Sequence, residues 1–170
     1  MKIYPLPVKK NKHGELVANL SVTRHYRQIM EEVLEAHAEN VGVFESNEAE
    51  ELADVITSCI TRLANIHSSV KNIGEFISGL VNAAKTYVDD SDFYTDLATS
   101  VIQAYSTQSC EELLDYYDVR YEDYDEDKSL AEVIALCEKR LESMGYNEVA
   151  REKLYAAVNE KNRRRGYLEA

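Results

Sequence analysis

The sequence predicts an all-α protein made of a single domain. The only two prolines, Pro5 and Pro7, lie near the N-terminal end, so the rest of the sequence lacks the residue that interrupts helices most strongly. Glycine, another poor helix former, occurs only 6 times in 170 residues. From residue 21 onward, apolar residues recur at the three- and four-residue spacing of amphipathic helices. The length is close to that of one domain with its own hydrophobic core.

The first 40 residues are expected to form a lead-in and one helix. Residues 1–19 combine a short apolar run with a polar turn, which is typical of an extended segment or a small hairpin. Ser21 is a favourable N-cap, and the helix that begins there should run to about Asn40. Its apolar stripe is formed by Val22, Tyr26, Ile29, Val33 and Ala36.

A second helix is expected after a short break. Gly42 interrupts the first helix, and Ser46 or Asn47 can cap the next one. Because the connection is short, we expect the two helices to pack as an antiparallel pair. The apolar stripe of the second helix is formed by Leu52, Val55, Ile56, Cys59, Ile60, Leu63 and Ile66.

The remaining sequence predicts more helices around this pair. Further helices are expected at about 71–88, 91–107, 110–119, 128–144 and 147–165. We expect residues 20–87 and 128–167 to form a core bundle of about four helices, and residues 88–127 to be an insertion that supplies additional helices or a lid. Within it, residues 111–127 hold nine acidic side chains and four tyrosines, a composition typical of a solvated loop.

Charge and cysteine content exclude several classes of protein. The 31 acidic and 19 basic residues give a net charge of -12, which disfavours binding to polymeric nucleic acid or to anionic membranes. No stretch approaches the roughly 18 apolar residues of a membrane span, and the first residues lack the apolar region of a signal peptide. The three cysteines lack the spacing of a zinc site or a disulfide framework. We therefore expect a reduced, cytoplasmic protein.

Two acidic pairs flank the apolar stripes of the first two helices. Glu32 and Glu35 belong to the first helix, and Glu51 and Asp54 belong to the second. Residues three apart lie about 60° apart around a helix, so each pair occupies one edge of its stripe. If the stripes pack together, the four carboxylates converge at one edge of the seam.

Converging carboxylates indicate a metal site. Like charges in a partly dry site oppose ionisation unless cations neutralise them. Oxygen ligands without Cys or His favour Mg²⁺ or Mn²⁺, which keep positions open for water and for substrate phosphates. Such pairs also arise by chance in so acidic a sequence, as at Glu112 and Asp115, so solvated helix faces are the alternative interpretation.

The C-terminal helix ends in a basic run. Lys161 and the three arginines 163–165 form a local cationic group in an acidic protein. Lysine and arginine are suited to phosphate oxygens, by point charge and by bidentate geometry. Cations are also favoured in the last turn of any helix, where they complement its dipole, so both interpretations stay open for this run on its own.

Together these motifs resemble the MazG family of all-α nucleoside triphosphate pyrophosphohydrolases. The first pair has the form Glu-x-x-Glu, and 15 residues separate it from the second, Glu-x-x-Asp, within Glu-Glu-Leu-Ala-Asp-Val-Ile. The closing Lys-Asn-x-x-Arg-Gly segment, residues 161–166, is also similar to that family. The resemblance covers residues 21–67 and about 150–167.

The resemblance implies a MazG-like helical bundle with a metal-dependent active site. It implies Mg²⁺ or Mn²⁺ as cofactor and hydrolysis of a (deoxy)nucleoside triphosphate between the α- and β-phosphates, which gives the monophosphate and pyrophosphate. It also implies a homodimer or homotetramer. The implied metal-binding and catalytic residues are Glu32, Glu35, Glu51 and Asp54, with Glu31 and Glu50 as neighbouring candidates. The implied substrate-binding residues are Lys161, Asn162 and Arg165.

A different class of protein also fits the composition. A non-catalytic helical protein, acting as a DNA mimic or an inhibitor, would present the acidic, tyrosine-bearing segment 111–127 to a basic partner. This alternative accounts for the net charge, but it leaves the paired acidic motif and the basic C-terminal run without a role.

Overall fold

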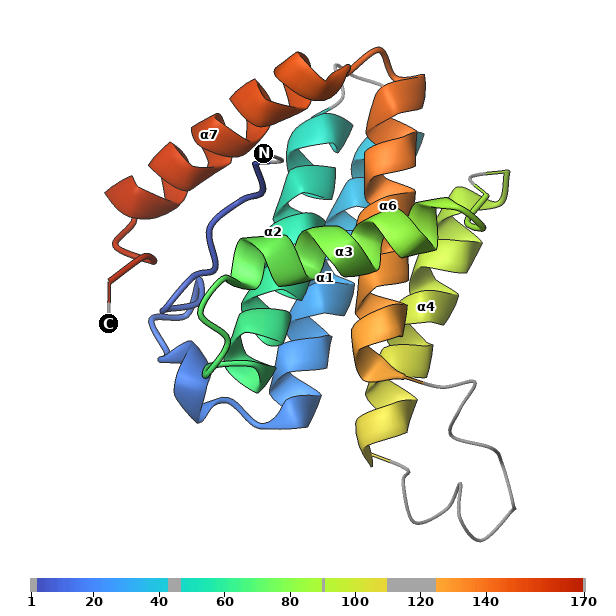
Figure 1. Cartoon of the computed structure of the whole chain (residues 1–170). Helices are drawn as coiled ribbons and strands as arrows, with labels where there is room; N and C mark the ends of the chain where they lie inside the picture. The colour runs from blue at the N-terminus through green and yellow to red at the C-terminus, as the bar shows by residue number, and fades with distance from the viewer. Residues whose placement is uncertain (1–2, 43–46, 90, 110–124, 170) are drawn as a thin grey trace, which may run out of the picture.

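The structure is a computed structural model that describes residues 3–42, 47–89, 91–109 and 125–169. Within these ranges it is all-helical and contains no β-strand, which confirms the predicted fold class. A short 3-10 helix, η1 (Val17–Asn19), precedes the longer helices (Figure 1). The α-helices are α1 (Val22–Val41), α2 (Glu48–Ile66), α3 (Ile73–Lys85), α4 (Phe93–Ser109), α6 (Glu126–Ser143) and α7 (Glu148–Arg164).

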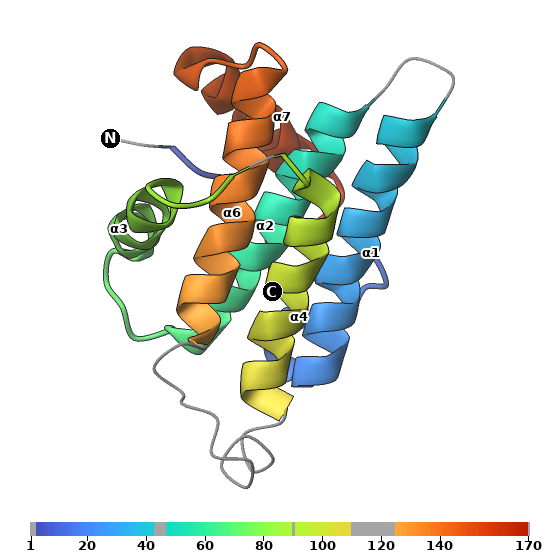
Figure 2. The same cartoon turned by 90° about the vertical axis from the view of Figure 1, so that its right-hand side faces the viewer.

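Four of these helices form a bundle, and two pack outside it. α1 contacts α2 and α4, and α6 contacts the same two helices from the other side. The antiparallel arrangement of α1 and α2 is visible in Figure 2. α3 crosses over α6, and α7 lies obliquely across α2 (Figure 1). The bundle interior is apolar: its fully buried side chains include Ile29, Leu52, Ile56, Leu97 and Ile134.

The position of α4 corrects the expectation that residues 88–127 are an insertion outside the core. Phe93, Leu97, Val101 and Ala104 are all buried, and they lie on the face of α4 that packs against α1 and α6. Their spacing of three and four residues makes one apolar stripe, whose burial stabilises the bundle. The helix expected at 110–119, and the rest of residues 110–124, lie outside the described residues.

The N-terminal segment runs back along the bundle toward the end of the chain. Lys10 pairs with Leu16 in an isolated antiparallel bridge, which forms the small turn expected in the lead-in. The backbone N–H groups of Lys9 and Lys10 donate to the carbonyl oxygen of Tyr167, at 2.6 and 3.0 Å. Residues from the two ends of the sequence therefore lie side by side next to α1, α2 and α7.

Over the described residues, none of the helices is both long enough and apolar enough to cross a membrane.

Candidate functional site

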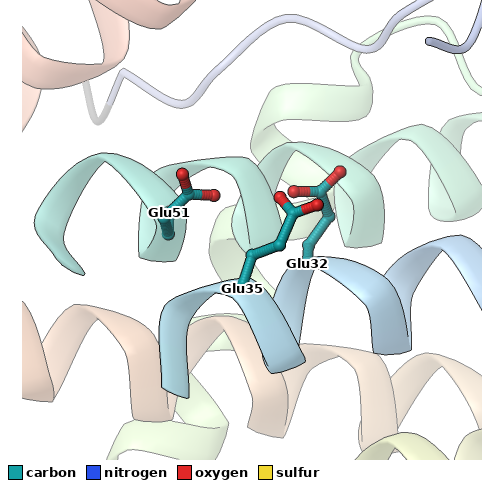
Figure 3. Close-up of side chains that lie close together, drawn as sticks. All are labelled: Glu32, Glu35 and Glu51. Atoms are coloured by element: carbon teal, nitrogen blue, oxygen red, sulfur yellow. The ribbon is translucent and has the colours of Figure 1, made fainter. Parts of the chain in front are cut away.

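Three carboxylates from two helices meet at the seam between α1 and α2. Glu32 and Glu35 project from α1 and Glu51 projects from α2, toward a common point (Figure 3). One oxygen of each lies within 4.8 Å of one oxygen of each of the others. The apolar stripes of α1 and α2 bring them together, because each acidic residue lies at the edge of a stripe that is buried in the seam.

The fourth predicted ligand, Asp54, lies one turn further along α2 and is held by a lysine. The ammonium group of Lys161, on α7, donates to both carboxylate oxygens of Asp54, at 2.9 and 3.1 Å. The same ammonium lies 3.0 Å from Oε1 of Glu50. The structure therefore places three of the four predicted ligands within reach of one ion and holds Asp54 beside them in an ion pair.

All seven predicted site residues line one cavity of about 330 Å³. The walls come from α1, α2, α7 and the N-terminal segment. Asn162 is buried there, 5 % exposed. The residues of the basic run face two directions. Lys161 and Arg165, four residues apart, line the cavity, whereas Arg163 and Arg164 form ion pairs with Glu160.

The neighbouring candidates Glu31 and Glu50 have other partners. Glu31 forms ion pairs with Lys12 and Arg27, at 3.3 and 3.4 Å, and does not line the cavity. Glu50 lines it but pairs with Lys161. The cavity is thus lined by Glu32 and Glu35 but not Glu31 on α1, and by Glu50 as well as Glu51 and Asp54 on α2.

The carboxylates oppose one another's ionisation. Burial, together with the charges of Asp54 and Glu35, raises the pKa of Glu32 to about 8 and that of Glu51 to about 7. Burial also raises the pKa of Asp54, although Lys161 opposes the shift. For Glu35, burial is outweighed by hydrogen bonds from Lys12 and Glu32, so its pKa falls. Near neutral pH the cluster is therefore only partly ionised, and a bound cation would favour its full ionisation.

One oxygen of the cluster lacks a hydrogen-bond partner. Oε2 of Glu51 is buried, and no group among the described residues bonds to it. A buried acceptor without a partner costs about 1–3 kcal/mol. A hard divalent cation would satisfy this oxygen, and a donor set of carboxylates alone fits Mg²⁺ or Mn²⁺. The residues present are therefore compatible with the metal that the sequence motifs imply.

Several cavity residues were not identified from the sequence. Lys10, Asn11 and Lys12 come from the N-terminal segment, and Gln28 and Tyr167 also line the cavity. Lys12 lies 3.3 Å from Oε1 of Glu35 and 3.3 Å from Oε2 of Glu31. Periodicity on α1 gives no sign of this contact, because it depends on how the segment folds back over the helix.

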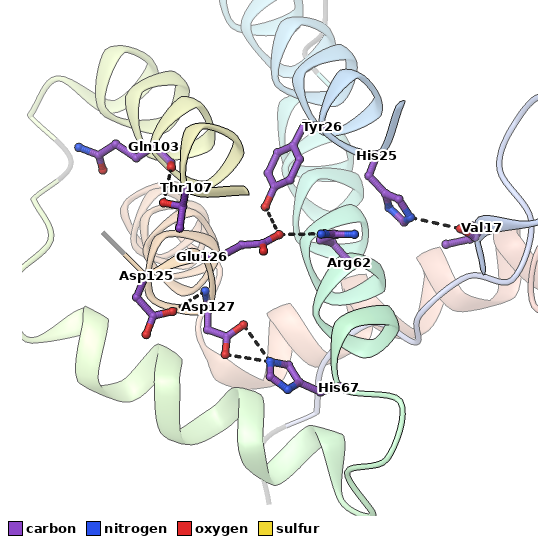
Figure 4. A network of polar contacts seen from close by, with 10 residues as sticks. All are labelled: Val17, His25, Tyr26, Arg62, His67, Gln103, Thr107, Asp125, Glu126 and Asp127. Carbon is purple, nitrogen blue, oxygen red and sulfur yellow. Dashed lines mark hydrogen bonds and ion pairs between the residues drawn. The ribbon is translucent and has the colours of Figure 1, made fainter. Parts of the chain in front are cut away.

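A second polar cluster lies at the other end of the α1–α2 pair and has a structural role (Figure 4). The buried Glu126 carboxylate accepts hydrogen bonds from Tyr26 and Arg62. Nearby, His67 pairs with Asp127 at 2.8 Å. These contacts tie the first turn of α6 to α1 and α2, and Glu126 and Asp127 each have a basic partner.

Divalent metal is expected to stabilise the folded protein. A cation that binds only the folded state, at about 100 times its Kd, adds about 2.7 kcal/mol. In a domain of this size that corresponds to a rise in Tm of about 5–10 °C. The test is a thermal melt with Mg²⁺ or Mn²⁺ against KCl of equal ionic strength, with reversal by EDTA. A Tm that does not respond to either ion contradicts a preformed metal site.

Comparisons with protein-family models, with curated proteins and with solved structures found no match to this chain.

Proposed function

We propose that this protein is a metal-dependent (deoxy)nucleoside triphosphate pyrophosphohydrolase with a MazG-like site. The observation that carries the proposal is the cavity itself, where carboxylates from α1 and α2 face Lys161 and Asn162 from α7 and Arg165 directly after it. An acidic side suited to Mg²⁺ or Mn²⁺ and a basic side suited to phosphate are the two parts that phosphoric anhydride hydrolysis requires.

Each side of the cavity has its own task in this reaction. Glu32, Glu35, Glu51 and Asp54 would hold Mg²⁺ or Mn²⁺, which when bound supplies positive charge for the phosphates and activates a water molecule. Lys161 and Arg165 donate to phosphate oxygens, and the Asn162 amide orients the chain of phosphates. A carboxylate that is not engaged by the ion accepts the proton of the attacking water.

The test is product analysis with each of the eight common nucleoside triphosphates, in Mg²⁺ or Mn²⁺. Cleavage between the α- and β-phosphates releases pyrophosphate and the monophosphate in equal amounts. Release of inorganic phosphate and the nucleoside diphosphate would contradict the proposed bond cleavage. Absence of any product would contradict the activity. The ranking of the eight substrates also identifies the preferred base and sugar.

The shared cavity of the predicted acidic and basic residues favours the enzyme over the non-catalytic interaction protein. A DNA mimic needs acidic groups that face a partner, whereas the cluster at Glu32, Glu35 and Glu51 shares its cavity with basic side chains. Most of the acidic segment 111–127 lies outside the described residues. Divalent metal separates the two functions, because only the enzyme requires it for activity.

The assembly and location of the protein also remain proposals. The resemblance to MazG proteins supports a homodimer or homotetramer, and the cysteine pattern supports a reduced, cytoplasmic protein. Sedimentation equilibrium gives the mass of the assembly directly, to be compared with the 19.4 kDa of one chain.

A further inference from the structure

We propose that Lys12 is a further phosphate-binding residue of this site and serves as the counter-charge of Glu35 until metal binds. The inference rests on the proposed function and adds to it a substrate-binding residue from the N-terminal segment. It follows from how that segment is fixed, from the symmetry of two lysines around the carboxylates, and from the charge of the cavity.

The N-terminal segment is anchored on both sides of Lys12. Before it, the backbone N–H of Val8 donates to Oγ1 of Thr61, at 3.0 Å, and the next two N–H groups bind the carbonyl oxygen of Tyr167. After it, the N–H of Val17 donates to the carbonyl oxygen of Lys9, at 2.9 Å. The side chain of Asn11 closes the turn by accepting the N–H groups of residues 13 and 15. Lys12 therefore extends from a fixed turn.

Two lysines approach the carboxylates from opposite ends of the sequence. Lys12 contacts the α1 side, at Glu31 and Glu35, and Lys161 contacts the α2 side, at Asp54 and Glu50. The side chain of Lys12 is 38 % exposed, so its ammonium group can turn toward the open cavity. Lys161 already has a proposed role on phosphate, and Lys12 has the same chemistry and an equivalent position.

The charge balance of the cavity shows why these lysines would change partners. Its lining includes five acidic side chains (Glu32, Glu35, Glu50, Glu51 and Asp54) and four basic ones (Lys10, Lys12, Lys161 and Arg165), a formal sum of -1 when all are ionised. One bound divalent cation changes this sum to +1, and two change it to +3. Carboxylates that ligate the ion no longer need the lysines, and the excess positive charge then favours a polyphosphate anion.

This arrangement predicts opposite effects of Lys12→Met on two ligands. Mn²⁺ alone should bind about threefold or more tightly to the variant, because a competing cation has been removed. In saturating Mn²⁺, an α,β-methylene nucleoside triphosphate should bind about tenfold or more weakly, because a charge-assisted hydrogen bond has been lost. Both affinities are measured by titration calorimetry, and Lys12→Arg should restore the affinity for the analogue.

The matched control is Lys9→Met, which removes the same charge three residues away. Lys9 is exposed and does not line the cavity, so this variant should bind both ligands like the wild type. Metal-free melting and circular dichroism confirm that each variant is folded. If Lys12→Met and Lys9→Met have the same affinities for Mn²⁺ and for the analogue, the role proposed for Lys12 is contradicted while the proposed function stands. If the wild type binds no Mn²⁺ at all, the proposed function fails as well.

Discussion

Glu51→Gln and Asp54→Asn are each expected to lower the rate of pyrophosphate release by about a hundredfold or more. Each substitution replaces a carboxylate by a neutral amide of the same shape, so the cavity keeps its form but loses a charge that would hold the cation. Even indirect partners of metal ligands typically change activity or affinity by about 10- to 100-fold, and a ligand itself should matter more. Steady-state rates in saturating Mg²⁺ or Mn²⁺ provide the measurement.

The control for these variants is Asp96→Asn, an equally conservative change in the first turn of α4. Asp96 does not line the cavity, so the rate should stay within about twofold of the wild type. Wild-type rates in both Glu51→Gln and Asp54→Asn would show that the carboxylate cluster is not the catalytic site.

The two variants should differ in stability although both lose activity. Glu51→Gln removes a charge that is repelled by Asp54 and Glu35, so the metal-free protein should melt at the same or a higher temperature. Asp54→Asn removes the same kind of repulsion but also breaks the ion pair with Lys161, so its stability should change less or fall slightly. Melting in EDTA separates these effects from the loss of activity.

The seam between α1 and α2 could be predicted because local periodicity determines it. The apolar stripes specify which faces pack, and the acidic pairs have a defined position beside those stripes. For this reason Glu32, Glu35 and Glu51 were placed correctly relative to one another without any tertiary information. The helix expected at 147–165 was also close to the observed α7, Glu148–Arg164.

Contacts between distant segments could not be predicted in the same way. The helix expected at 91–107 is present as α4, but it was expected outside the core, because the resemblance to the MazG family covers only residues 21–67 and about 150–167. The ion pair between Asp54 and Lys161 depends on the angle at which α7 crosses α2. Lys12 reaches Glu35 only because backbone hydrogen bonds join the N-terminal segment to the end of the chain. None of these contacts leaves a periodic signal in the sequence.

The metal-free protein is expected to lose stability as the pH rises from 6.5 to 8.5. The pKa values of Glu32, about 8, and Glu51, about 7, both lie above the ordinary value of 4.5. At pH values between 4.5 and these raised pKa values, the folded state keeps protons that the unfolded state has released. Raising the pH therefore favours unfolding. The buried His25 has a lowered pKa and acts in the opposite sense, but its contribution is complete above its ordinary pKa of 6.5. The carboxylates therefore dominate this window. Burial also raises the pKa of the Cys59 and Cys137 thiols above the ordinary 9.0, and these thiols add to the same trend only at the upper end of the window.

Divalent metal should remove or reverse this pH dependence. The carboxylates must be ionised to hold the ion, so metal binds more tightly at higher pH and its stabilising effect grows as the metal-free protein weakens. The measurement is Tm at pH 6.5, 7.5 and 8.5, in EDTA and in Mg²⁺. Glu32→Gln should flatten the curve in EDTA, whereas Glu132→Gln, at a residue away from the cavity, should leave it unchanged. A metal-free Tm that is constant or rises with pH would contradict the mutual repulsion on which the metal site is argued, because carboxylates that ionise freely have no need of a cation.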